Sequence, residues 1–181
     1  KAKIFFSEAL NYYNSIGDKN GMAYAHLGLG NAIQSEGNFE SAIENYKKSI
    51  ELYKEVHNEK DIGKPYLSLS YLYTFLGKLD LAEQFAKDAM EIGLVSKDKF
   101  IECNALQALG SIYIRREKYQ ESNQFLNDAK KIAEELQNNY LVSLSVKRIG
   151  INYANLNEAE NAIKYFNEAL QIAESTGDLT T

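Results

Sequence analysis

Apolar and polar residues alternate along this chain with the period of an α-helix, in segments separated by short polar turns. In one segment, Tyr66, Leu69 and Tyr73 follow the three- and four-residue spacing that places side chains on one helical face. Gly77 interrupts this pattern, and a second apolar stripe of the same period starts at Leu79. The pattern therefore predicts two antiparallel helices joined by a short turn.

The same pair of helices recurs along the chain, because small residues and turn residues return every 40 positions. Four columns show the repetition: Ala9, Ser49, Ala89, Ala129 and Ala169; Ala2, Ala42, Ala82, Ser122 and Ala162; Gly30, Ser70, Gly110 and Gly150; and Asp18, Asn58, Asp98, Asn138 and Asp178. Repetition at such a period indicates a tandem-repeat protein. We expect helices at residues 1–16, 20–36, 39–57, 60–76, 79–96, 99–116, 119–137, 140–156 and 159–176.

Turn residues support these boundaries. Glycine and asparagine favour a left-handed conformation at a helix end, which is expected at Gly37, Gly77 and Asn157. In the fourth column, four residues precede the next helix and can cap free backbone N–H groups with their side chains: Asp18, Asn58, Asp98 and Asn138. Pro65 is expected near a helix start, where its missing N–H costs least.

The predicted fold is all-α: a right-handed superhelical solenoid of antiparallel helix pairs, about nine helices in all. One array would cover residues 1–181. It would begin with the second helix of a truncated repeat at 1–19 and continue through repeats at 20–58, 59–98, 99–138 and 139–181. The first helix of each pair is expected to line a concave wall.

The composition of the chain limits the kinds of partner that this array is expected to bind. With 45% hydrophobic residues the chain can bury a core, spread along its length. The formal net charge of −5 provides no general attraction to nucleic acid or to an anionic membrane. No apolar run reaches the ~20 residues needed to cross a bilayer. The single cysteine suits a reducing compartment, so we expect a cytoplasmic protein. Because the sequence begins at Lys1, it leaves open whether a signal peptide or an anchor precedes it.

Signals of catalysis are weak. His26 and His57 stand alone, without the spacing of a metal site, and Cys103 has no histidine nearby in sequence. Gly28-x-Gly30 lies inside a predicted helix and lacks the third glycine of a dinucleotide motif, so it is interpreted as a packing feature. We therefore expect no catalytic residue, no metal ion and no cofactor.

The candidate binding residues are the polar and aromatic groups that the core columns leave on the first helices. Amides can both donate to and accept from a peptide backbone, and cations would favour a ligand that carries carboxylates. The expected peptide-binding residues are Asn31, Gln34, Tyr71, Phe75, Asn104, Gln107, Ser111, Arg115, Lys147, Arg148 and Asn155.

The motif residues resemble the tetratricopeptide repeat family over essentially the whole chain. The family pattern appears as Leu109-Gly110 and Tyr113 on a first helix, and as Ala162, Phe166 and Ala169 on a second. The usual family repeat has 34 residues. The longer spacing here, together with Leu29-Gly30-Asn31, Gly37-Asn38-Phe39 and the turns at Gly17-Asp18 and Gly177-Asp178, resembles two branches of the family. These are the Leu-Gly-Asn-repeat adaptors and the peptide-sensing regulators of the Rap type. This resemblance implies a solenoid that binds proteins or extended peptides.

Three functions remain open. The chain is first expected to be a non-catalytic scaffold, as a piece of a larger adaptor or regulator. It would otherwise be an oligomerisation module, in which Ile4, Phe5 and Leu10 of the unpaired first segment expose an apolar strip for self-association. The third alternative is a regulatory segment fused to a signalling enzyme.

Overall fold

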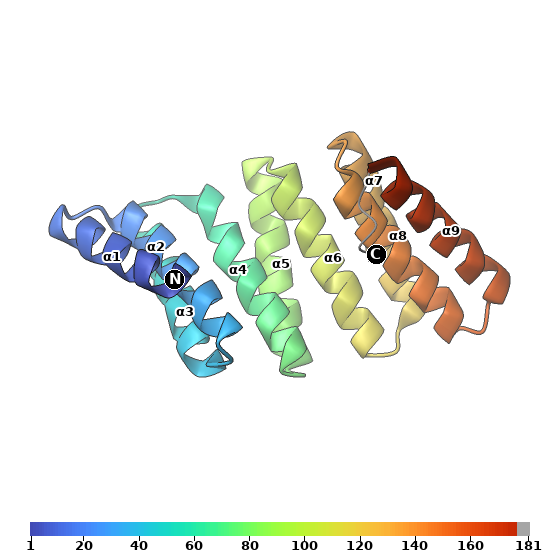
Figure 1. Ribbon diagram of the computed structural model, residues 1–181, viewed down its shortest axis with the longest axis horizontal. Coiled ribbons are helices and arrows are strands. Elements are labelled where there is room, and N and C mark those ends of the chain that lie inside the picture. Colours follow the sequence, from blue (N-terminus) through green and yellow to red (C-terminus); the bar gives the residue numbers. More distant parts are fainter. Residues whose placement is uncertain (177–181) are drawn as a thin grey trace. The chain divides into compact units, whose positions relative to one another are not determined.

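The computed structural model describes residues 1–176, which form nine α-helices connected by tight turns (Figure 1). Their bounds are α1 Ala2–Ser15, α2 Lys19–Ser35, α3 Phe39–Glu55, α4 Glu59–Phe75, α5 Leu79–Ser96, α6 Lys99–Arg115, α7 Tyr119–Glu135, α8 Asn139–Asn155 and α9 Ala159–Thr176. Every predicted helix is present, and each end lies within about two residues of its predicted place, as is usual for helix boundaries. The all-α fold is confirmed, with helices packed in pairs as in a tetratricopeptide solenoid.

The helices form two compact units. Residues 1–96 hold α1 to α5, in which α2 packs on α3 and α4 on α5, while α1 covers α2 and α3 contacts α4. The second unit starts at Lys97, and within it α6 packs on α7, α8 on α9 and α7 on α8. The predicted division into four repeats and the handedness of the array stay predictions.

The turns share one geometry that local sequence explains. A residue with positive φ follows each helix from α1 to α8, at Gly17, Gly37, His57, Gly77, Lys97, Glu117, Gln137 and Asn157. At the end of α2, Gly37 N donates to Gln34 O at 2.9 Å and Asn38 N to Ile33 O at 3.3 Å, which is the Schellman arrangement. The left-handed conformations predicted at Gly37, Gly77 and Asn157 are confirmed.

Asp and Asn side chains cap the first helices as predicted. Asp18 Oδ1 accepts from Gly21 N at 3.0 Å and begins α2, and Asn58 and Asn138 cap α4 and α8 in the same way. Asp98 caps α6. The fifth member of this column, Asp178, lies outside the described residues.

The prediction for Pro65 is wrong. Helix α4 begins at Glu59, so this proline stands inside the helix and not at its start. It cannot donate to the carbonyl of Asp61, but its ring is buried in the packed interior. Burial of an apolar ring compensates in part for the lost hydrogen bond.

Glycines on the first helices let large side chains of the second helices approach closely. A Cβ on Gly30 would lie 2.5 Å from Tyr46 Cε1, and one on Gly28 would lie 2.2 Å from Phe6 Cε1. The interpretation of Gly28-x-Gly30 as a packing feature is therefore confirmed. These contacts hold Phe6 of α1 and Tyr46 of α3 closely against α2.

Candidate functional site

The candidate binding residues fall on the first helices of the two units. Those of the N-terminal unit are called here the N-terminal face: Asn31 and Gln34 on α2, and Tyr71 and Phe75 on α4. Those of the other unit are called the C-terminal face: Asn104, Ser111 and Arg115 on α6, and Lys147, Arg148 and Asn155 on α8.

Aromatic side chains stand exposed on the N-terminal face. Phe75 is 66% exposed and Tyr71 is 38% exposed, and the two lie one helical turn apart on α4. The Phe75 ring also contacts Phe39 at the start of α3, with ring centroids 5.3 Å apart. This arrangement provides an apolar surface at the C-terminal end of α4.

The two amides of the N-terminal face meet at one buried hydroxyl. Asn31 is exposed and Gln34 half-buried, and the Tyr46 hydroxyl lies 2.9 Å from Asn31 Oδ1 and 2.7 Å from Gln34 Oε1. Burial raises the pKa of Tyr46 to about 12, so the hydroxyl keeps its proton at neutral pH. Sequence reasoning placed Tyr46 in the core and missed this contact. The only sequence signal for this contact was that Tyr46 lies one helical turn before Ser49, a member of the first small-residue column.

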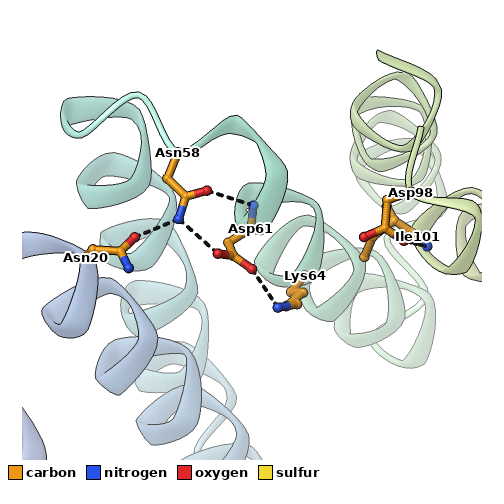
Figure 2. Close-up of polar contacts among 6 residues, drawn as sticks. All are labelled: Asn20, Asn58, Asp61, Lys64, Asp98 and Ile101. Carbon is orange, nitrogen blue, oxygen red and sulfur yellow. Dashed lines mark hydrogen bonds and ion pairs between the residues drawn. The ribbon is translucent and has the colours of Figure 1, made fainter. Parts of the chain in front are cut away.

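Polar contacts also join the N-terminal ends of α2 and α4 (Figure 2). Asn58 Nδ2 donates to Asn20 Oδ1 at 2.6 Å and to Asp61 Oδ2 at 2.9 Å. Lys64 pairs with Asp61 at 2.6 Å, and this hydrogen bond is the largest cause that lowers the Asp61 pKa. The capping residue of α4 thus also links the start of this helix to the start of α2, and these two helices carry the N-terminal face.

The cap of α6 resembles that of α4, because the Asp98 side chain also accepts hydrogen bonds from the first turn of its own helix. Asp98 Oδ1 accepts from Ile101 N and from Phe100 N, both at 3.1 Å. Figure 2 draws Asp98 beside Ile101. The cap therefore positions the start of α6 through its own backbone.

Polar groups of the C-terminal face bond mainly to their own helices. Asn104 Nδ2 donates to Phe100 O at 2.7 Å, Ser111 Oγ to Gln107 O at 2.8 Å, and Asn155 Nδ2 to Ile151 O at 2.9 Å. These bonds use the hydroxyl proton of Ser111 and one of the two N–H donors of each amide.

The expectation that Gln107 lines an open wall is wrong. Its side chain is 1% exposed, and its Nε2 donates to Leu141 O and to Ser145 Oγ, both at 2.9 Å. Gln107 therefore connects α6 to α8 inside the second unit. A glutamine stands here where the preceding repeats have Leu27 and Leu67, both buried, so the column belongs to the core.

Cations provide the remaining groups of the C-terminal face. Arg115 ends α6 and is exposed, Lys147 on α8 is exposed, and the neighbouring Arg148 is half-buried. Three cations on two helices of an otherwise acidic chain give this face a local positive charge.

The residues with reactive side chains stand apart from one another. His26 Nδ1 lies 2.9 Å from Asn45 Oδ1, and His57 occupies a turn. Burial raises the pKa of the Cys103 thiol to about 11, and its Sγ donates to Ala129 O. In the part of the chain that the structure describes, no cluster of His, Cys, Asp and Glu could hold a metal ion.

Helix α1 has an exposed apolar strip. Ile4 and Phe5 are exposed, together with Tyr12 and Ile16, and Leu10 is half-buried. Across residues 1–176, none of the helices combines the length and the apolar character needed to span a membrane.

Two family models, both described as tetratricopeptide repeat, match residues 21–94 and 148–176. The chain belongs to the tetratricopeptide repeat family. Domains of this family typically bind proteins or peptides and are generally non-catalytic. The matched segments include α2 to α4, most of α5, and α9, so the family assignment covers helices of both units.

One curated relative of this repeat protein is the photosystem I assembly protein Ycf3 of Prochlorococcus marinus (strain MIT 9215), 30% identical over 121 residues. The match spans 67% of this chain and 65% of that protein, so just under two thirds of the relative is represented.

Solved structures with the same fold include BtubC from P. vanneervenii, with a TM-score of 0.84 and 16% identity over 97% of this chain and 73% of that one. A Rap protein complexed with Competence and Sporulation Factor has a TM-score of 0.75 and 18% identity, over 93% of this chain and 48% of the Rap chain. The expected similarity to Rap-type regulators is therefore confirmed at the level of the fold.

Proposed function

We propose that this chain is a non-catalytic scaffold that binds an extended protein or peptide segment through the exposed faces of its first helices. The proposal includes a cytoplasmic location and a place within a larger adaptor or regulator. It excludes nucleic acid and membranes as partners. The observation that carries it is the N-terminal face, where exposed aromatic rings and hydrogen-bonding amides share the first helices of one unit.

The exposed rings favour binding over a merely solvated surface. Phe75 and Tyr71 are large side chains on α4, whose aliphatic side chains are buried, so burying them against a ligand would remove apolar area from water. Amides beside them can satisfy the main-chain groups of that ligand. Apolar side chains and an extended backbone are the two features that such a surface recognises.

The C-terminal face favours a ligand with acidic groups. Arg115 and Lys147 are exposed cations, and Asn155 offers an amide oxygen on the same face. A guanidinium group pairs well with a carboxylate. Because the net charge of the chain is −5, the rest of the molecule does not attract acidic partners, so this local positive charge would have to bind them. The Rap protein that shares this fold was solved in complex with Competence and Sporulation Factor, which supports a ligand-binding role for the fold.

A displayed random-peptide library selected on the purified protein tests this proposal. Peptides recovered from it should bind the Asn31→Ala, Phe75→Ala double variant at least about tenfold more weakly, since each change removes contacts worth about 1 kcal/mol or more. Acidic peptides should lose affinity for the Arg115→Ala, Lys147→Ala double variant and should bind more weakly as salt rises.

The control is Lys131→Ala on α7, which removes an exposed cation from a second helix. Its affinity should equal that of the wild type, and circular dichroism should show equal helicity for all variants. Peptides that bind every variant alike would contradict the assignment of the faces.

Self-association through α1 is a second candidate function. Phe5 is 62% exposed, whereas three of the four corresponding residues, Phe85, Phe125 and Tyr165, each pack against a tyrosine of the preceding first helix. If this strip drives dimerisation, sedimentation should show a concentration-dependent dimer that Phe5→Glu abolishes. A monomer at all concentrations would remove this candidate.

A further inference from the structure

We propose that Tyr46 positions the Asn31 and Gln34 amides so that together they bind the main-chain N–H and C=O of one residue of an extended ligand, one amide donating and the other accepting. The inference rests on the proposed function of the N-terminal face. Tyr46 would then be a positioning residue, supplied by a second helix to a surface made by first helices.

The fold brings this hydroxyl to the N-terminal face through a glycine. Tyr46 is on α3 and is 1% exposed, and its ring lies so close to Gly30 of α2 that a Cβ there would clash with it. Because the ring passes over Gly30, its hydroxyl reaches the next turns of α2, where Asn31 and Gln34 project.

The number of protons at this site decides how the amides are oriented. The hydroxyl has one proton, while two amide oxygens lie within hydrogen-bonding distance of it. The shorter contact, to Gln34 Oε1 at 2.7 Å, takes the proton. Asn31 is then satisfied when its amide turns by 180°, which exchanges two groups of nearly equal size, and its NH₂ donates to the hydroxyl oxygen.

This arrangement leaves two different groups for a ligand. Gln34 holds its oxygen on Tyr46 and presents its NH₂ outward, and Asn31 holds its NH₂ on Tyr46 and presents its oxygen. In an extended chain the N–H and C=O of one residue point to the same side, so the pair complements the two main-chain groups of one ligand residue. Recognition at this point would depend on the backbone of the ligand and little on its sequence.

The site belongs to one repeat only. The residues in the same column as Tyr46 are Phe6, Ala86, Leu126 and Phe166, which have no hydroxyl. No other residue of this column can therefore orient two amides through a hydroxyl. A backbone-reading site would anchor the ligand on α2, beside the exposed rings of α4.

Tyr46→Phe tests the inference, because it keeps the ring against Gly30 and removes only the hydroxyl. Tyr53→Phe is the matched control, since Tyr53 is a buried tyrosine on the same helix. The probe is a peptide selected on the wild-type protein, together with versions that are N-methylated at each backbone position in turn. Two-dimensional NMR of the Asn31 and Gln34 side-chain amides provides a readout that needs no ligand.

Tyr46→Phe should lower the affinity for the peptide by about tenfold, as expected for the loss of a hydrogen-bonded network. Tyr53→Phe should keep the affinity within about twofold of the wild type. One N-methyl position should weaken binding to the wild type and cause no further loss in Tyr46→Phe, because both changes remove the same interaction. Wild-type affinity for Tyr46→Phe would overturn the inference.

The two proposals can fail separately. If no peptide is recovered, the proposed function fails, and the NMR signals then decide the positioning role. Amide signals of Asn31 and Gln34 that move and exchange faster with water in Tyr46→Phe, but not in Tyr53→Phe, would support that role. Signals that stay unchanged in both variants would overturn it.

Discussion

Gly110→Ala should destabilise the wild-type protein and stabilise the Leu126→Ala variant. In the wild type, a Cβ on Gly110 would lie 2.6 Å from Leu126 Cδ2 and 2.7 Å from its Cγ, and both atoms belong to a fully buried side chain. The leucine has no open space to enter, so the added methyl group forces a local shift. The equivalent positions of an earlier repeat hold Ser70 and Ala86, a larger residue facing a smaller one.

The expected free energies follow from these contacts. Overpacking a buried interface costs about 1–3 kcal/mol, while alanine stabilises a helix by about 1 kcal/mol relative to glycine. The single Gly110→Ala change should therefore lower the free energy of unfolding by about 1 kcal/mol. Leu126→Ala alone should lower it by about 2–5 kcal/mol, since it leaves a cavity. With the leucine removed, the clash disappears and the helix propensity of alanine remains.

Urea unfolding followed by circular dichroism measures all four proteins of this double-mutant cycle. Because the two units can unfold in separate transitions, the midpoint to compare is the one that Leu126→Ala shifts. The coupling between the two changes should be about 1–3 kcal/mol in favour of the double variant. Additive effects, or the same sign of the Gly110→Ala effect in both backgrounds, would refute the proposed steric contact. Gly150→Ala should cost less, because Phe166 opposite is 40% exposed and can move.

Three further predictions concern turns, pH and the thiol. Glu117 has a φ of 60°, so Glu117→Gly should raise the free energy of unfolding by about 0.5–1 kcal/mol, and Gly77→Ala should lower it by about 1 kcal/mol, both measured in urea. The pairing with Lys64 lowers the Asp61 pKa below its unfolded value of about 3.9. The contribution of Asp61 to the free energy of unfolding is therefore complete above pH ~3.9 and is lost as the pH falls through the folded pKa. Asp61→Asn should therefore reduce the loss of stability between neutral pH and acid, and an unchanged pH profile would argue against the pairing. Burial raises the Cys103 pKa to about 11, so iodoacetamide should label this thiol far more slowly than a free cysteine at neutral pH, with urea restoring the rate.

Sequence reasoning succeeded where a structure depends on neighbours along the chain. Helix positions follow from apolar spacing, and the caps of Asp18 and Asn138 follow from side chains that reach a backbone N–H three residues away. The left-handed turn at Gly37 is equally local. The same reasoning did not anticipate left-handed conformations at Lys97 or Glu117, because a turn fixed by packing on both sides imposes that conformation on any residue.

The candidate site was only partly predictable, because exposure depends on which helices meet. Gln107 has the polarity of a binding residue, yet α8 approaches closely enough to bury it. Tyr46 has the character of a core residue, yet its hydroxyl reaches the amides of α2. Pro65 lies in an apolar environment that compensates for a position unfavourable to proline.

The sequence by itself determined the helices, their pairing and the family, since all three follow from the period of apolar residues and from a repeat of 40 positions. Only the tertiary structure decided which polar groups remain available to a partner. Hydrogen bonds such as those of Tyr46 and Gln107 join residues on different helices, and their geometry exists only after the helices have packed.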